Sequence, residues 1–236
     1  MSNGNHAFVL LHSPLVGPLT WSPVAAEMGR RGLDVFVPNL EDSPDSKDPF
    51  WKQHAESVSR ALSQIPAETP LTLVAHSGAG PLLPAIRRLL PNPIRAYIFV
   101  DAGIPRANAS RLELMKSEDP EWANDFQKEL ERGERFPTWS FDDLQEVIPD
   151  QAPRRQMIAE LQPRGLDFFT EPIPVFDGWP DATCIYIQFS DAYRQPVAQA
   201  RQAGWPAYEL NAGHFHMLVD AKIVTDFIVH AMKEQS

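Results

Sequence analysis

Cysteine is almost missing from this 236-residue chain, which contains only Cys184. One cysteine excludes an internal disulfide framework. Long hydrophobic runs are missing as well: the apolar stretch Ala7–Leu11 is too short for a signal peptide or a membrane span. The residues before this stretch include no lysine or arginine that could form the basic start of a leader. We therefore expect a protein of a reducing, cytoplasmic compartment that has no membrane partner.

Positively charged residues are also fewer than negatively charged ones. The chain has 21 lysine and arginine residues against 31 aspartate and glutamate residues, which gives a formal net charge of −10 at pH 7. The sequence isoelectric point is about 5.1. A surface of this charge is repelled by the phosphate backbone of nucleic acids and by anionic lipid headgroups. We therefore expect neither nucleic acid nor a membrane as a partner.

Apolar residues, in contrast, are plentiful at 43%, and the length suits a single domain. Six short apolar runs are continuous rather than alternating in polarity, as is typical of strands buried on both faces of a parallel sheet. Helical stretches separate the runs, and this alternation predicts a doubly wound α/β fold. The expected strands are residues 7–12, 33–38, 71–76, 96–100, 183–189 and 207–210.

Four helices are expected between and after these strands, at 22–32, 48–63, 79–90 and 220–233. Residues 102–180 interrupt the alternation. This segment is acidic and rich in aromatic residues, and its composition predicts helices at 112–135, 141–146 and 153–161.

The strongest motif lies where the third expected strand ends. Residues 71–80 lead from an apolar run into a turn with Ser77 at its tip, and apolar residues at helical spacing follow. A nucleophile elbow has this order of strand, sharp turn and helix, and its strained turn requires small neighbours. Ser77 is therefore the candidate nucleophile. The small neighbours are Ala75, Gly78, Ala79 and Gly80.

Through the motif Ala75-His76-Ser77-Gly78-Ala79 and the order of the residues below, the chain resembles the α/β-hydrolase family, in its small esterase, lactonase and hydroxynitrile-lyase-like branch. The resemblance covers nearly the whole chain. It implies a mostly parallel sheet of about six strands, without the two antiparallel strands that open the sheet in many members. It also implies a core of residues 1–101 and 181–236 and a helical cap of residues 102–180. Most aromatic residues of this cap are expected to form its own small core, and a minority to line a pocket.

A bare serine hydroxyl is a weak nucleophile and needs an adjacent base. The resemblance implies which residues act as this base and as the acid that orients it. The Gly-His pair at His214 is the expected base, with His216 as the less favoured candidate. Two aspartates end expected strands and could orient that base. Asp191 occupies the usual position of the acid in the family and is favoured. Asp101, after the preceding strand, is the alternative.

The expected oxyanion hole departs from the family pattern. One donor should be the N–H of Gly78, the residue after the nucleophile. The second should come from the loop after the first strand, but Pro14 stands at that position and proline has no N–H. The amide of Leu15, in a shifted loop, and the hydroxyl of Ser13 are the two possible replacements. We favour Leu15. An absent donor would cost about 3–4 kcal/mol of transition-state stabilisation.

These residues predict a serine hydrolase that cleaves a small, fairly apolar ester or lactone through an acyl-enzyme. The alternatives are a hydroxynitrile-lyase-type C–C lyase with the same triad and a catalytically weak ligand-binding protein. We expect a small-molecule, ester-like substrate, no cofactor, and a monomer or homodimer. No metal is expected, because the pair His214 and His216 lacks a nearby cysteine or carboxylate cluster at ligand spacing. The residues expected to contact substrate are Ser13, Trp21, His76 (which also packs beneath the nucleophile), Trp139 and Phe215.

Overall fold

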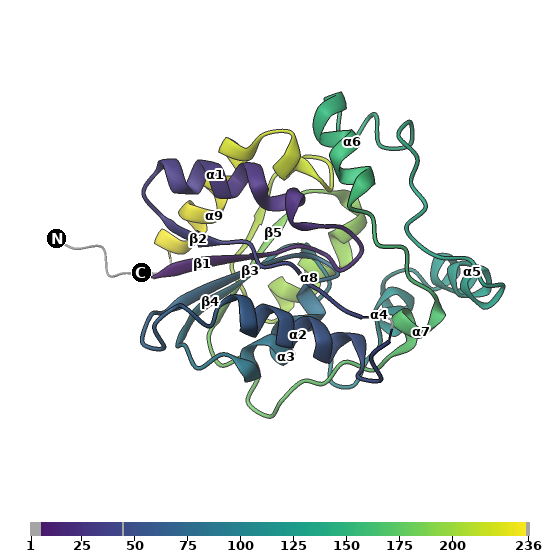
Figure 1. The fold of residues 1–236 in the computed structure, drawn as a ribbon, viewed down its shortest axis with the longest axis horizontal. Coiled ribbons are helices and arrows are strands. Elements are labelled where there is room, and N and C mark those ends of the chain that lie inside the picture. The colour runs from purple at the N-terminus through teal and green to yellow at the C-terminus, as the bar shows by residue number, and fades with distance from the viewer. Residues whose placement is uncertain (1–5, 44, 235–236) are drawn as a thin grey trace.

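A single parallel sheet organises the molecule (Figure 1). The computed structural model describes residues 6–43 and 45–234, so residues 1–5, where we expect no basic leader, lie outside the described residues. Within that part of the chain all five strand pairs are parallel, and the strand order is β2-β1-β3-β4-β5-β6. The predicted fold class is confirmed. The strands are β1 (Ala7–Leu11), β2 (Asp34–Phe36), β3 (Leu71–Ser77), β4 (Ile94–Ala102), β5 (Thr183–Gln188) and β6 (Ala207–Glu209).

Helices cover both faces of the sheet. One face packs against α1 (Ser22–Arg30) and α9 (Ala221–Lys233). The other packs against α2 (Phe50–Ala61), α3 (Leu83–Leu89) and α8 (Arg194–Gln202). The four helices predicted outside residues 102–180 are present, and α3 is preceded by a short 3-10 turn. Helix α8 was not predicted, because only three of its nine residues are buried and most of its sequence is polar.

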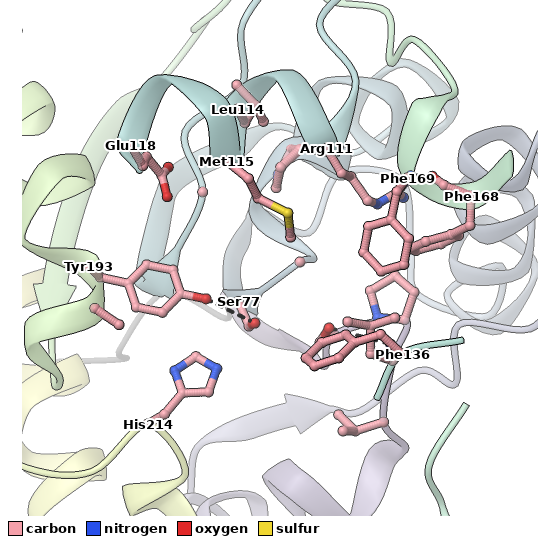
Figure 2. A pocket seen from close by; sticks show the side chains of 18 of the residues that line it. Ser77, Arg111, Leu114, Met115, Glu118, Phe136, Phe168, Phe169, Tyr193 and His214 are labelled. Carbon is pink, nitrogen blue, oxygen red and sulfur yellow. Dashed lines mark hydrogen bonds between the residues drawn. The ribbon is translucent and has the colours of Figure 1, made fainter. Parts of the chain in front are cut away.

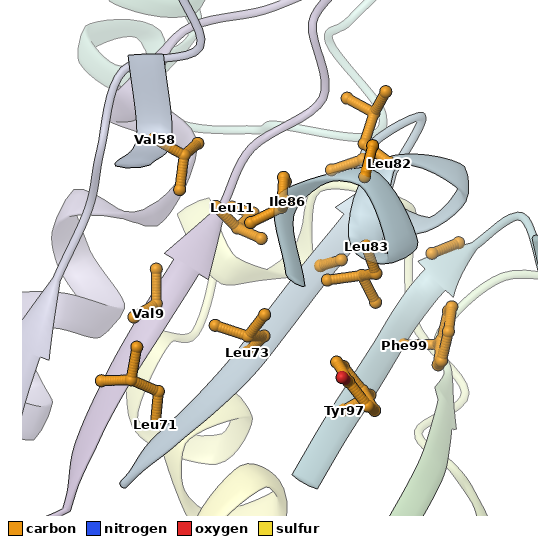
Figure 3. Close-up of a cluster of buried hydrophobic side chains, with 14 of the residues drawn as sticks. Val9, Leu11, Val58, Leu71, Leu73, Leu82, Leu83, Ile86, Tyr97 and Phe99 are labelled. Carbon is orange, nitrogen blue, oxygen red and sulfur yellow. The ribbon is translucent and has the colours of Figure 1, made fainter. Parts of the chain in front are cut away.

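Strand side chains fill the core on both sides of the sheet. On β1, Val9 and Leu11 point towards α2 and α3 (Figure 3), whereas Leu10 points to the α1 and α9 side. All three are fully buried. The same alternation holds on β4, where Phe99 and Ile98 lie on opposite sides. Because helices cover both faces, both sets of side chains must be apolar, and this explains the continuous apolar runs.

The segment between β4 and β5 carries four helices that lie beyond the carboxyl ends of the strands (Figure 1). The single helix expected at 112–135 is wrong: the chain leaves helical geometry at Asp119, which caps the next helix by accepting a hydrogen bond from the Trp122 amide. Pro120 explains the break, since proline disfavours helical geometry in the residue before it. Residues 141–146 form turns, not the expected helix. The four helices are α4 (Arg111–Glu118), α5 (Pro120–Glu131), α6 (Gln151–Ala159) and α7 (Leu166–Thr170).

Three of these helices, α4, α5 and α7, share a small apolar cluster of their own, in which Phe126, Phe168 and Phe169 are buried together with Leu112 and Leu130. Only four of the nine aromatic residues of this segment belong to the cluster, and five line the pocket described below, so the expectation that most form a local core and a minority line a pocket is wrong. Among the described residues, no helix combines the length and the hydrophobicity that crossing a bilayer requires.

Candidate active site

Ser77 ends β3 and adopts a positive φ of 55°, in the left-handed region that non-glycine residues rarely occupy. A strained turn of this kind is the geometry expected of a nucleophile elbow. Gly80 makes the turn possible, because a Cβ atom there would lie 2.2 Å from the carbonyl oxygen of Gly103 at the end of the neighbouring strand. The hydroxyl of Ser77 opens into a pocket (Figure 2).

His214 lies on the loop after β6, with its ring beside Ser77 in the same pocket (Figure 2). Its Nδ1 atom is 3.1 Å from Oδ2 of Asp101. Beneath it, His76 donates a hydrogen bond from Nε2 to the backbone oxygen of His214 at 3.0 Å. Burial, and secondly the nearby His214 ring, lowers the pKa of His76 well below its usual value. His76 is therefore neutral and places no positive charge next to the His214 ring.

Asp101 is fully buried at the end of β4, with a positive φ of 42°. Its carboxylate accepts hydrogen bonds from the Phe189 amide at 2.6 Å, the Ser190 amide at 3.1 Å and the Ser190 hydroxyl at 2.6 Å. With His214, four donor groups surround it. This network fixes the carboxylate, and the carboxylate in turn fixes the orientation of the imidazole.

Asp191, the favoured acid, occupies a different position. It opens a short 3-10 helix (Asp191–Tyr193) and its side chain is exposed. The structure does not bring Asp191 to His214; the hydrogen bond expected of it is made by Asp101. The loop at Phe189 and Ser190 wraps around the Asp101 carboxylate, and this path carries Asp191 out to solvent.

Tyr193 was not foreseen in the site. Its hydroxyl is 3.1 Å from Oγ of Ser77, and its ring stacks on His214 with centroids 5.1 Å apart and an interplanar angle of 6°. Burial raises the pKa of the Tyr193 phenol, so the group stays protonated at neutral pH and can donate to Ser77. No motif marks this residue, because only the fold of the loop after β5 brings it to Ser77.

The loop after β1 makes a tight turn at Ser13, where the amide of Val16 donates to the Ser13 carbonyl at 3.1 Å. His12 secures the turn, with Nδ1 2.9 Å from the same carbonyl and Nε2 accepting from the Leu40 amide at 3.1 Å. Burial lowers the pKa of His12 to about 4. The ring therefore stays neutral, so that Nδ1 can donate a hydrogen bond while Nε2 accepts one.

This turn decides which group faces Gly78. The Leu15 amide, favoured as the second oxyanion donor, is directed at Oγ of Ser13 with a separation of 3.4 Å. Ser13 Oγ in turn is the atom nearest to a Cβ built on Gly78, at 3.0 Å, and Pro14 follows at 3.6 Å. The side chain beside the Gly78 backbone is therefore Ser13, and the Leu15 amide already has an acceptor.

The pocket has a volume of about 360 Å³, and most of its wall is aromatic or aliphatic. Of the five residues expected to contact substrate, Ser13, Trp139 and Phe215 line it. Trp21 and His76 do not: both are fully buried, and their rings pack edge to face at 6.1 Å. Tyr193, after β5, also lines the pocket, and the rest of the aromatic wall comes from the segment between β4 and β5: Trp122, Phe136, Phe168 and Phe169.

A family model described as "Alpha/beta hydrolase family" matches residues 8–226. The chain belongs to that family. No curated protein sequence gives a significant match to this α/β-hydrolase. Within residues 6–43 and 45–234, no three His, Cys, Asp or Glu side chains are grouped so that they could hold a metal ion.

Solved structures of similar shape span nearly the whole chain. An extracellular α/β-hydrolase from a Paenibacillus species has a TM-score of 0.75 at 17% identity, covering 96% of this chain and 98% of that one. Polyneuridine aldehyde esterase has a TM-score of 0.73 at 15% identity, with coverages of 96% and 98%. A pyrethroid hydrolase from Sphingobium faniae has a TM-score of 0.70 at 15% identity, with 97% of each chain covered. At these identities the likeness concerns the fold of this α/β-hydrolase.

Proposed function

We propose that the protein is a serine hydrolase that cleaves small, fairly apolar carboxylic esters or lactones with the triad Ser77, His214 and Asp101. The observation that carries the proposal is the hydrogen bond from His214 to the buried Asp101, made by a ring that lies beside a serine on a strained elbow. An imidazole held in this way presents Nε2 to the nucleophile and can carry a positive charge during turnover.

In the first step, Oγ of Ser77 attacks the ester carbonyl and its proton passes to Nε2 of His214. The tetrahedral intermediate then collapses: the bond to the leaving alcohol breaks, and that oxygen takes the proton from His214. Water repeats both steps on the acyl-enzyme and releases the acid. In this mechanism the Tyr193 hydroxyl donates a hydrogen bond to Ser77 Oγ and holds that oxygen in place. The proton of the Ser77 hydroxyl is then directed to His214.

For the oxyanion hole we propose the Gly78 amide together with the Ser13 hydroxyl, in place of the Leu15 amide. Ser13 Oγ lies beside Gly78, and both residues line the pocket with Ser77, which supports this pair because two donors must reach one oxygen of the intermediate. With this pair of donors, the missing N–H of Pro14 does not impair the oxyanion hole. The role of Pro14 is to tighten the turn that places Ser13.

The segment of residues 102–180 would act as the cap, because its side chains form much of the pocket wall above Ser77. The lyase alternative requires a free positive group in this cap to hold a leaving anion. Arg111 of α4 lines the pocket, but it is paired with Glu171 at 2.8 Å, and its guanidinium lies 3.8 Å from the centre of the Phe168 ring. This pairing favours the hydrolase.

The proposal is tested by reaction with a fluorophosphonate probe followed by peptide mapping. A fluorophosphonate reacts only with an activated serine, so we expect the label on Ser77 and none in Ser77→Ala. The same two proteins are assayed with short p-nitrophenyl esters, and the variant should lose hydrolysis while keeping the circular dichroism spectrum and melting temperature of the parent. A labelled serine elsewhere, or full ester hydrolysis by Ser77→Ala, would reject the nucleophile.

The Ser13→Ala variant should lower kcat for ester hydrolysis by about 10²-fold with little change in KM, since one oxyanion donor is typically worth this much. Ser63→Ala, which removes an exposed hydroxyl far from the pocket, is the matched control. If kcat survives in Ser13→Ala, the second donor is another group. A gain of about tenfold in Pro14→Gly would show instead that a donor is missing and that a new amide supplies it.

A further inference from the structure

Glu118, the last residue of α4, places its carboxyl group in the wall of the same pocket as Ser77, on the side of Tyr193 (Figure 2). Among the residues that the structure describes, nothing donates a hydrogen bond to this carboxyl group or forms an ion pair with it. Burial alone raises the pKa of Glu118 to about 7. The pocket thus contains an acid whose charged form lacks a partner, and a ligand cation would supply one.

The other formally charged residue of the wall is already neutralised. Arg111 pairs with Glu171, and its Nη1 atom also donates to the carbonyl of Phe168 at 3.1 Å. Its remaining Nε and Nη2 atoms have no hydrogen-bond partner but are fully covered by neighbouring atoms, so a ligand in the pocket cannot reach them. Glu118 is only partly buried, so its carboxyl group remains within reach of a ligand.

Aromatic surfaces complete the surroundings of Glu118. Trp122, at the start of α5 and 49% exposed, and Tyr193 line the same pocket. The faces of such rings attract cations, and desolvation strengthens this attraction. The net charge of −10 adds a field that draws cations to the surface.

We propose that the pocket recognises esters whose acyl or alcohol part carries a cationic group, a protonated amine or a quaternary ammonium, and that Glu118 is the carboxylate that binds it. This substrate class rests on the proposed ester hydrolysis. The cation would lie between Glu118 and the aromatic wall, with the ester carbonyl at Ser77.

The first arm of the test compares butyrate esters of trimethylammonio-alkanols of increasing spacer length with their uncharged tert-butyl isosteres. Each pair has the same shape and differs in one charge. At mildly alkaline pH, where Glu118 is ionised, kcat/KM for the best cationic ester should exceed that of its isostere by about tenfold or more. In Glu118→Gln this ratio should fall several-fold, to the smaller preference that the aromatic rings supply. Glu121→Gln, the same change at an exposed residue of α5 outside the pocket wall, should keep the ratio of the parent.

The second arm measures binding without turnover. Tetraethylammonium is titrated calorimetrically into Ser77→Ala and into the double variant Ser77→Ala/Glu118→Gln, and the double variant should bind about tenfold more weakly or worse. Neutral esters cleaved as fast as cationic ones, with binding unaffected by Glu118→Gln, would overturn the cation site and leave the hydrolase standing. Glu118-dependent binding of tetraethylammonium by a protein that cleaves neither ester would reject the hydrolase and retain the cation site.

Discussion

Replacing Asp101 by asparagine is expected to lower kcat for ester hydrolysis by up to about 10⁴-fold, the size of the equivalent change in serine proteases. The asparagine oxygen can still accept from the Phe189 amide, which leaves its NH₂ group facing Nδ1 of His214. Two donors cannot face each other, so His214 must carry its proton on Nε2 instead. That tautomer cannot accept the proton of Ser77.

The control for this prediction is Asp191→Asn, which changes an exposed carboxylate just after the neighbouring strand β5 and should leave kcat within about twofold of the parent. Asp101 also holds the Phe189–Ser190 loop, so the melting temperature is measured for both variants. Binding of an apolar fluorescent ligand to the pocket is measured as well. If Asp101→Asn is folded and binds the ligand as the parent does, its loss of activity is a catalytic effect. A large loss in Asp191→Asn with a tolerated Asp101→Asn would return the acid to Asp191.

His214→Ala should abolish ester hydrolysis to the same extent as Ser77→Ala, on the order of 10⁴-fold or more, and the double variant should be no worse than either. The non-additivity follows because Ser77 cannot attack without a group that takes its proton, so either loss disables the same step. Steady-state kinetics with p-nitrophenyl butyrate measures all three proteins.

His216→Ala is the matched control, because His216 lies two residues away, packs edge to face against Phe189 at 6.3 Å and does not line the pocket. Its kcat should stay close to that of the parent. If His216→Ala is the more damaging change, or if the two single variants multiply in the double variant, Ser77 and His214 do not act as one unit.

Much of the fold is predictable here because each layer leaves a local pattern. Strands buried on both faces must be apolar throughout, and the six runs found in this way coincide with the six strands within a few residues. The four central strands are buried as expected, whereas the edge strands β2 and β6 are partly exposed. The helix breaks were less predictable: Pro120 marks the end of α4, yet composition alone suggested a continuous helix across it. Helix α8 has few buried residues and an otherwise polar sequence, so it was not predicted.

The residues of the candidate site also differ in whether a local sequence pattern reveals them. Ser77 and His214 belong to motifs with local causes, a strained turn and a Gly-His loop, so each is visible in one stretch of sequence. Tyr193 and Glu118 have no local signature, because they reach the pocket from the loop after β5 and from the end of α4. Side chains that converge from distant segments leave no pattern at fixed spacing.

The sequence by itself predicted the parallel sheet, which the structure confirms, and it marked Ser77 and His214 as the candidate nucleophile and base. Only the tertiary structure shows that Asp101, and not Asp191, is buried beside His214, since both follow strands and the path of the Phe189–Ser190 loop separates them. Likewise, only the tertiary structure shows that the turn after β1 directs the Leu15 amide at Ser13 Oγ, the observation behind the proposed Ser13 donor. In both cases the choice depends on which hydrogen bonds a loop makes across strands, and hydrogen bonds between distant segments are not encoded in local spacing.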